Sequence, residues 1–249
     1  MRILLINANT SAFVTEKAAA EATLAASPGT SIVAVTGDFG PRVITTRSEN
    51  AIAGHSTIAL AAEHAAGCDA AVIAVSYDTG LPGAREALSI PVVGMTEAGL
   101  LTACMLGGRI GIVVFGQRVL PMYQELVNFY GLSNRIASWR VLESSKPYAA
   151  GDQSEVEQSL IDAANDLVRR DGAEVVFLAG AVMAGVPRKI QASVPVPLLD
   201  GIGCGVRQAE VLVRLGVPKP TAGSYALPPQ REMVAVSPAI ERMFGLRTS

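Results

Sequence analysis

Residues 7–11, Asn-Ala-Asn-Thr-Ser, follow an apolar run and precede an Ala-rich stretch that is typical of a helix. The first turn of a helix presents unpaired N–H groups and a partial positive charge. We therefore expect Asn7, Asn9 and Thr10 to contact a carboxylate or imide oxygen of a substrate. In the alternative interpretation, Thr10 or Ser11 only caps the helix. The two roles are compatible.

Residues 75–80, Val-Ser-Tyr-Asp-Thr-Gly, form the most polar cluster that follows an apolar run. Asp78 is a candidate general base if burial raises its pKa, and Ser76 and Thr79 are candidate hydrogen-bond donors to an oxyanion. Tyr77 is a candidate proton donor or relay. We predict that Ser76, Tyr77 and Asp78 are catalytic and that Thr79 binds substrate. The alternative is an Asx-type turn, in which Asp78 binds neighbouring amides and Gly80 supplies an unusual dihedral angle.

Two further segments are expected to bind substrate without supplying a nucleophile. Residues 180–185 are small or apolar, so the backbone amides of Gly180 and Ala181 are the groups that can contact a ligand there. Gly116, Gln117 and Arg118 begin a predicted helix, where they can hold an anionic group. A solvated arginine is the usual alternative. Weaker candidates are Tyr123, His55 and Arg47.

The cysteines are expected to be free and structural. Cys68, Cys104 and Cys204 are far apart in apolar surroundings, with no CxxC spacing. Cys204 begins a predicted helix, a position that lowers a thiol pKa, but a buried structural thiol is the preferred interpretation. The two histidines do not share metal-ligand spacing with acids. We therefore predict neither a zinc site nor a cofactor.

These candidate residues must be positioned by the elements around them, and the hydrophobic pattern predicts an α/β protein. Runs rich in Val and Ile alternate with Ala-rich helical stretches, as in βαβ units around a mostly parallel sheet. Strands are predicted at 2–7, 30–37, 70–76, 90–95, 109–115, 135–142, 174–180 and 194–200. Helices are predicted near 12–26, 50–66, 82–88, 97–106, 119–130, 154–170 and 203–215.

An internal repeat divides this pattern into two similar halves. GCDAAVIAVSYDTG from Gly67 resembles GAEVVFLAGAVMAG from Gly172, 105 residues later. RILLINANTSAFVTE from Arg2 resembles RIGIVVFGQRVLPMY from Arg109, and the runs near 90 and 194 also match. We predict two pseudo-symmetric open sheets, with 1–97 plus 205–249 in one half and 98–204 in the other. Because open α/β sheets bind ligands beyond the carboxyl ends of their strands, the polar segments should line one cleft between the halves.

Composition and missing motifs exclude several classes of partner. Charged residues make up 17% of the chain and the formal net charge is -2, which disfavours a nucleic-acid surface. No uncharged apolar run approaches the roughly 20 residues that cross a bilayer. No GxGxxG precedes a helix, and neither a Walker loop nor GxSxG occurs. We predict a cytosolic enzyme whose partner is a small-molecule substrate, and neither nucleic acid nor membrane.

Several segments together resemble hydantoin and allantoin racemases of the aspartate/glutamate racemase superfamily. NANTS is similar to their NPNTS, and ITTRSEN at 44–50 to their IESRxDE. VIAVSYDTGLPGARE at 72–86 resembles VIACFDDPGLxAARE, and GAEVVFLAGAVMAG resembles GAxxIVLGCAGM. The resemblance covers nearly the whole chain. It implies two pseudo-symmetric sheets, association into a homo-oligomer, and a pair of cysteines that exchange a proton on opposite faces of a stereocentre.

Aligned without gaps, this chain has Val75 and Gly180 at the two cysteine positions, and the 105-residue repeat relates the same two positions. Neither side chain can transfer a proton. The leading hypothesis is a cysteine-independent lyase, hydrolase or one-base isomerase that acts on a small carboxylate, lactone or cyclic ureide or imide. Its chemistry would pass through an enolate-like or tetrahedral oxyanion.

In this hypothesis the substrate lies between the two matched segments. Asp78 or Tyr77 would move the proton. The oxyanion would be held by Asn9, Ser76 and the amides near Gly116 and Gly180. Two alternatives remain open, namely a true racemase with non-standard bases and a non-catalytic homologue that binds a small molecule.

Overall fold

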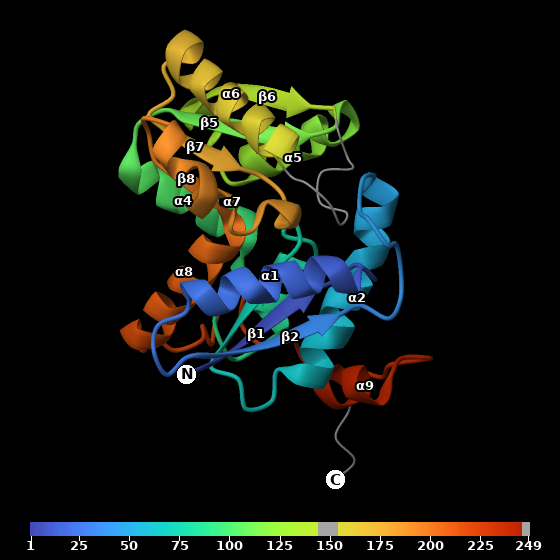
Figure 1. Ribbon diagram of the computed structural model, residues 1–249. Coiled ribbons are helices and arrows are strands. Elements are labelled where there is room, and N and C mark those ends of the chain that lie inside the picture. Colours follow the sequence, from blue (N-terminus) through green and yellow to red (C-terminus); the bar gives the residue numbers. More distant parts are fainter. Residues whose placement is uncertain (144–153, 246–249) are drawn as a thin grey trace.

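Two four-stranded parallel sheets form the core of the computed structural model, which describes residues 1–143 and 154–245. The first sheet has the order β2-β1-β3-β4 and the second has the order β6-β5-β7-β8. In Figure 1 the second sheet lies above the first. The strands are β1 (Arg2–Asn7), β2 (Ser31–Thr36), β3 (Ala70–Ile73), β4 (Val92–Gly94), β5 (Ile110–Phe115), β6 (Ile136–Leu142), β7 (Val175–Leu178) and β8 (Leu198–Asp200). The predicted fold class is confirmed.

In both sheets the central strands are covered on both faces. In β1, β3, β5 and β7 nearly every residue is buried, whereas the edge strands β2 and β6 are partly exposed. Continuous apolar runs, without alternation, are the pattern of strands in such parallel sheets. Strands matched by the sequence repeat occupy equivalent places, since β1 corresponds to β5, β3 to β7 and β4 to β8.

The helices of the first sheet are α1 (Ala12–Ala25), α2 (Arg47–His64) and α3 (Leu81–Ala87). Helix α2 starts with a capping box, in which the Thr46 side chain accepts from the Glu49 amide and the Glu49 carboxylate accepts from the Thr46 amide. The helices of the second sheet are α5 (Leu120–Phe129), α6 (Ser154–Asp171) and α7 (Val186–Ile190).

Helices α4 (Met95–Leu106) and α8 (Gly201–Leu215) connect the two sheets and pack against each other. Both predicted boundaries between the halves, at 97/98 and 204/205, fall inside these helices, so the division stays a prediction. Residues 144–153 and 246–249, which the predicted halves include, lie outside the described residues. The α4–α8 contact needs Gly201, because a Cβ there would lie 2.7 Å from the carbonyl oxygen of Met95.

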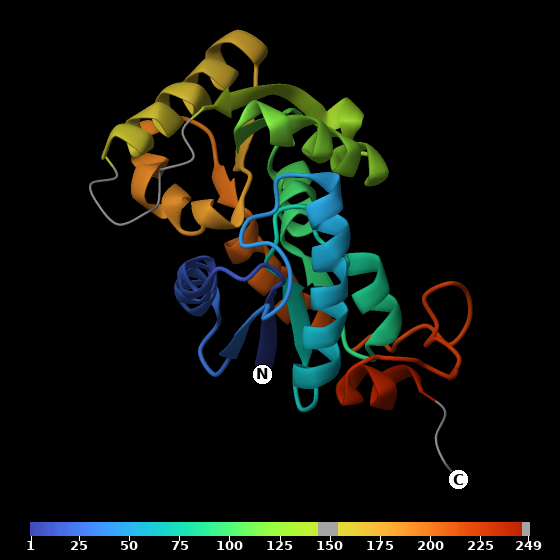
Figure 2. The ribbon, with the colours of Figure 1, turned by 90° about the vertical axis from the view of Figure 1, so that its right-hand side faces the viewer.

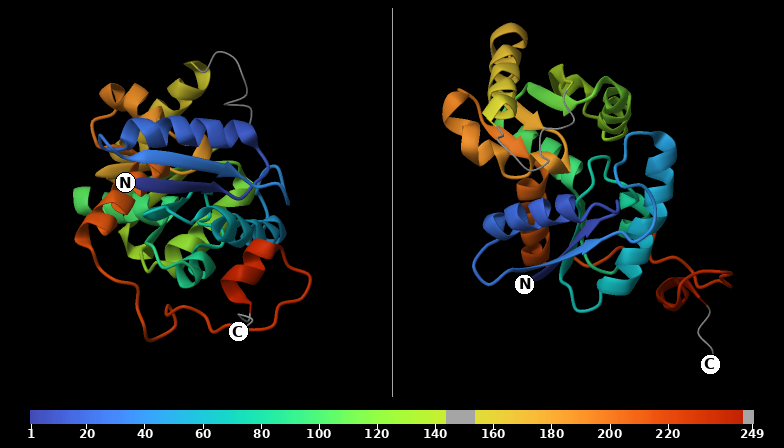
Figure 3. Two further views of the ribbon diagram at one scale, coloured as in Figure 1. Left: turned by 90° about the horizontal axis from the view of Figure 1, so that it is seen from below. Right: turned by 45° about the vertical axis from the view of Figure 1, so that its right-hand side comes forward.

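The last described helix, α9 (Pro238–Phe244), packs against α2 of the first half. Figure 2 shows α9 beside the lower end of α2, and the left view of Figure 3 shows the extended segment that leads to it from α8. Neither α7 nor α9 was predicted. Both are short, with five and seven residues, and begin at or next to a proline. Within the described residues, every helix is too short or too polar to span a bilayer.

The contact between α4 and α8 makes stability sensitive to one added methyl group. We expect Gly201→Ala to lower the free energy of unfolding by about 1–3 kcal/mol, because the backbone of α4 would have to move. Urea denaturation of the full chain measures this change. The control is Gly54→Ala in α2, where nothing lies within 4 Å of the added Cβ and a helix interior gains about 0.5–1 kcal/mol. Equal effects of the two substitutions would contradict the close α4–α8 contact.

Candidate active site

A cavity of about 660 Å³ lies between the two sheets, at the carboxyl ends of their strands. Its walls come from the segments that follow β1, β2, β3, β5 and β7, and from the start of α1 and α5. This is where open parallel sheets bind ligands. The described lining residues are Asn9, Ser11, Phe13, Val14, Arg42, Val43, Ile44, Thr45, Val75, Ser76, Tyr77, Phe115, Val119, Tyr123, Ala179, Gly180, Ala181 and Val182.

The cavity has a buried floor and an exposed mouth. Val75, Tyr123 and Ala179 are buried and form part of the floor. At the mouth, Phe13 is 45% exposed and Val43 is 60% exposed, although both are large apolar side chains. A ligand would therefore contact buried groups at the floor and exposed apolar side chains at the mouth.

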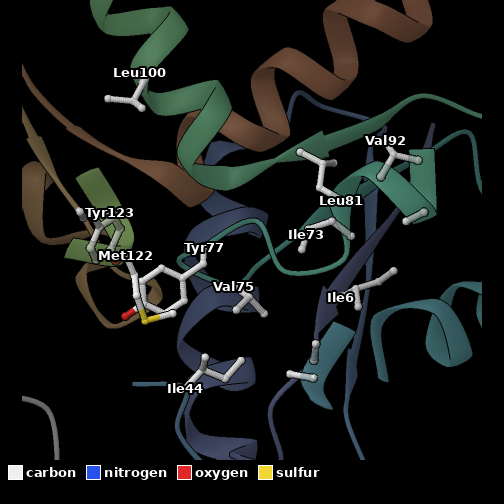
Figure 4. Close-up of a cluster of buried hydrophobic side chains, with 14 of the residues drawn as sticks. Ile6, Ile44, Ile73, Val75, Tyr77, Leu81, Val92, Leu100, Met122 and Tyr123 are labelled. Carbon is white, nitrogen blue, oxygen red and sulfur yellow. The ribbon is translucent and has the colours of Figure 1, made fainter. Parts of the chain in front are cut away.

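On the floor, Ser76 connects the two halves. The amide of Ala181, 105 residues away, donates to Ser76 Oγ at 3.4 Å, and Ser76 also hydrogen-bonds to Tyr123 of α5. The rings of Tyr77 and Tyr123 lie side by side, with centroids 5.0 Å apart, as Figure 4 shows. Burial raises the pKa of Tyr123 well above its ordinary value, and burial also raises the pKa of Tyr77. Both phenols are thus protonated at neutral pH and can donate a hydrogen bond to a ligand.

The carboxylate of Asp78 is directed away from this floor, to the N-terminus of α4. It accepts from the amide of Thr96 at 2.9 Å, from the amide of Glu97 at 2.8 Å and from Tyr130 Oη at 2.6 Å. Burial raises the pKa of Asp78 to about 7, against the opposing effect of these three hydrogen bonds. Asp78 is not among the lining residues, and the amides that it binds belong to α4, not to a local Asx turn.

In the first segment, only Asn9 and Ser11 reach the cavity. Asn9 Oδ1 accepts from the Ser11 amide at 2.9 Å and from Asn7 Nδ2 at 3.0 Å, which leaves Asn9 Nδ2 as the donor for a ligand. Asn7 is buried beneath this turn. The Thr10 amide donates to the carbonyl of Pro41, and Thr10 does not line the cavity. The segment therefore positions one asparagine amide.

Four other predicted substrate-binding residues lie outside the described lining. Thr79 is buried and donates to Asn50 Oδ1 at 2.5 Å, and the amide of Gly116 donates to a carbonyl of β6. Gln117 and Arg118 are exposed in a short 3-10 helix before α5. The predicted residues that line the cavity together are Asn9, Ser76, Tyr77, Gly180 and Ala181.

Sequence reasoning ranked Tyr123 as a weak candidate and did not select Arg42 or Thr45, which all line the cavity. Arg42 and Thr45 belong to the loop after β2, and the rule that ligands bind beyond strand carboxyl ends applies to this loop too. The sequence therefore contained the information needed to predict Arg42 and Thr45 as lining residues. Tyr123 gave no comparable signal, because it reaches the floor from within a helix.

The two positions that the sequence resemblance matched to cysteines both lie in this cavity. Val75 is buried, and Gly180 has a φ of +127°, which side chains rarely adopt. None of the described lining residues is a cysteine. Cys204 lines a separate cavity of about 350 Å³, where burial raises its pKa to about 12.

Comparison with known proteins identifies the class. Residues 3–209 match the family model of the Asp/Glu/hydantoin racemases, and the chain belongs to this family. A hydantoin racemase from Paenarthrobacter aurescens is 34% identical over 93% of this chain and 99% of its own length.

Two solved structures of allantoin racemases have the same fold. The protein from Klebsiella pneumoniae superposes with a TM-score of 0.89 at 29% identity, over 94% of this chain and 96% of the other. The protein from Pseudomonas fluorescens gives a TM-score of 0.86 at 32% identity, over 94% of this chain and 100% of the other. The likeness extends over both halves of the molecule.

The raised pKa of Asp78 predicts a pH dependence of stability. Because the folded-state pKa of about 7 exceeds the ordinary value of 3.8, the folded state binds more protons, and stability falls as the pH rises from about 4 to 7. The loss is on the order of 4 kcal/mol. We expect Asp78→Asn to reduce this slope in urea denaturation at several pH values, and the slope that remains comes in part from Asp200, whose pKa burial raises to about 6. Asp38→Asn, at an exposed position, is the control and should keep the slope. An unchanged slope in Asp78→Asn would show that this carboxyl has an ordinary pKa.

Proposed function

We propose that this chain is a cysteine-independent enzyme of the Asp/Glu/hydantoin racemase family. It acts on a small carboxylate, lactone or cyclic ureide or imide through an enolate-like or tetrahedral oxyanion. The observation that carries the proposal is the set of neutral hydrogen-bonding groups on the cavity floor, Ser76, Tyr123 and the amide of Gly180, with Val75 beside them and the Ala181 amide bound to Ser76.

We assign one direction to this chain of donors. Since the Ala181 amide can only donate, Ser76 Oγ accepts from it, and in the proposed arrangement the Ser76 hydroxyl donates to Tyr123 Oη. The phenol proton is then left for a substrate oxygen. Fixed neutral donors in a site with little water stabilise developing negative charge strongly, because they need no reorganisation during the reaction. Asn9 Nδ2 adds a further donor from the first half.

The same groups limit the chemistry. A buried phenol with a raised pKa gives up a proton to a carbanion, but at neutral pH it does not remove one from carbon. The floor therefore favours lyase chemistry, in which cleavage of a substrate bond, such as loss of carbon dioxide, leaves the electron pair on the enolate. Tyr77 then protonates the carbon and recovers its proton from solvent water, while Tyr123 keeps its proton on the substrate oxygen. Asp78 acts in this scheme as a positioning residue, because its carboxylate faces α4.

The backbone at Gly180 supports chemistry from one side. A φ of +127° is strained for any residue with a Cβ, so the wall at this position offers backbone and not a second acid or base. The tyrosines and Ser76 lie on the floor beside it. A carbanion in the cavity would then receive its proton from one face, and the product would have a single configuration.

A second candidate function is racemisation by non-standard bases. It is favoured by the 34% identity to a hydantoin racemase over nearly the full length of both chains. In that case a base must come from outside the positions 75 and 180. Association into a homo-oligomer and a cytosolic location stay predictions in either case.

Incubation in deuterated water separates these functions. A panel of 5-substituted hydantoins, lactones and activated dicarboxylates is followed by NMR and chiral chromatography. We expect turnover of an activated acid to one enantiomer with one deuterium at the α-carbon. Exchange of the α-proton with loss of optical purity would instead establish a racemase, and saturable binding without exchange or turnover would indicate a non-catalytic homologue.

Removal of the phenol proton should reduce turnover. We expect Tyr123→Phe to lower kcat by about 10²–10³-fold, the usual cost of one oxyanion donor, with a small change in KM. Ser76→Ala should give a loss of similar kind. Tyr225→Phe, in the exposed C-terminal segment, is the matched control and should keep full activity. Full activity of Tyr123→Phe with an intact fold would refute the proposed floor chemistry.

A further inference from the structure

Arg42 is the one charged side chain among the described residues that line the main cavity. It lies in the loop between β2 and α2, at the mouth, and is exposed. Its guanidinium makes no ion pair or hydrogen bond within the described part of the chain. The nearby Arg47, in contrast, pairs with Glu125 of α5 across the two halves.

Neither acid close to Arg42 in sequence neutralises it. Asp38, four residues earlier, forms no ion pair with Arg42 in the part of the chain that the structure describes, and Glu49 is held elsewhere. Glu49 accepts from the amide of Thr45 at 2.7 Å, from the Thr45 hydroxyl at 3.0 Å and from the amide of Thr46 at 2.9 Å. These contacts hold its carboxylate at the start of α2. A free guanidinium beside apolar walls creates a positive potential in the cavity and can bind a carboxylate in a bidentate manner.

The walls between the mouth and the floor are apolar. Phe13 and Val43 remain largely exposed at the mouth, and a ligand with an apolar body would cover them. The floor beyond them carries the donors of Ser76 and Tyr123. A cavity of about 660 Å³ is also larger than a single five-membered ring requires, since pockets of roughly 300–1,000 Å³ hold drug-sized ligands. The complementary ligand has a carbonyl at one end, an apolar body, and an anion at the other end.

We propose that Arg42 is a specificity-determining residue, which selects substrates whose aryl or alkyl body carries a carboxylate remote from the reacting carbonyl. The placement of the reacting end rests on the proposed function. The selection of the anionic end rests on Arg42 alone. Lysine at this position would keep the charge but lose the bidentate geometry.

Isothermal titration calorimetry of the full chain with 5-benzylhydantoin and 5-(4-carboxybenzyl)hydantoin tests this proposal. The two probes share one body and differ by the remote carboxylate. We expect the carboxylated probe to bind about tenfold more tightly, and the advantage to shrink at high salt. Arg42→Gln should remove the advantage while leaving the affinity for the benzyl probe unchanged, and Arg42→Lys should keep part of it. The control Arg214→Gln removes one exposed charge from α8 and should change neither affinity.

Equal affinities for the two probes, no measurable binding of the carboxylated probe, or an advantage that survives in Arg42→Gln would each overturn the proposal. Failure of the proposed function gives a different pattern. Full turnover by Tyr123→Phe, with the Arg42-dependent difference in affinity intact, would refute the proposed reaction at the cavity floor and support the role of Arg42. Loss of turnover in Tyr123→Phe, with equal affinities for the two probes, would support the reaction at the cavity floor and refute the role of Arg42.

Discussion

The buried carboxylate of Asp78 connects the elements that surround the cavity. It joins the loop after β3 to the N-terminus of α4 through two amides, and to Tyr130, beyond α5, through a phenol hydroxyl. These partners come from both halves of the chain. Because a buried carboxylate is costly without such donors, the three elements are held in one arrangement. Ser76 and Tyr77, just before Asp78 in the chain, are thereby placed on the cavity floor.

The two halves share one backbone fold but place different chemical groups at the cavity. The two sheets have the same strand order, and Ser76 meets the amide of its repeat partner Ala181 across the interface. One wall thus contributes hydroxyl groups and the other contributes backbone amides. A symmetric pair of acid–base side chains suits a reaction at two faces of one carbon, whereas these unlike walls suit stabilisation of charge on an oxygen. Equivalent strands position the two walls, and the side chains determine what each can do.

The electrostatics of the cavity follow from burial. Removing phenols from water favours their neutral form, so Tyr77 and Tyr123 stay protonated. At the mouth, the Arg42 side chain is exposed to solvent. A ligand would therefore meet a permanent cation first and neutral donors at depth, with apolar side chains between them.

The alternation of apolar runs with Ala-rich stretches determined the strands and the longer helices, because a buried parallel strand requires a continuous apolar run whatever its partner is. Matched segments in the same order determined the repeat. The carboxyl-end rule then selected Asn9, Ser76 and Gly180, which line one cavity, although Thr79 and Gly116, selected by the same rule, lie outside its described lining. Only the tertiary structure decided the direction of individual groups. Asp78 faces α4, and Tyr123 enters from α5, because partners from distant segments determine where each side chain points. Neighbouring residues in the sequence carry no record of those partners.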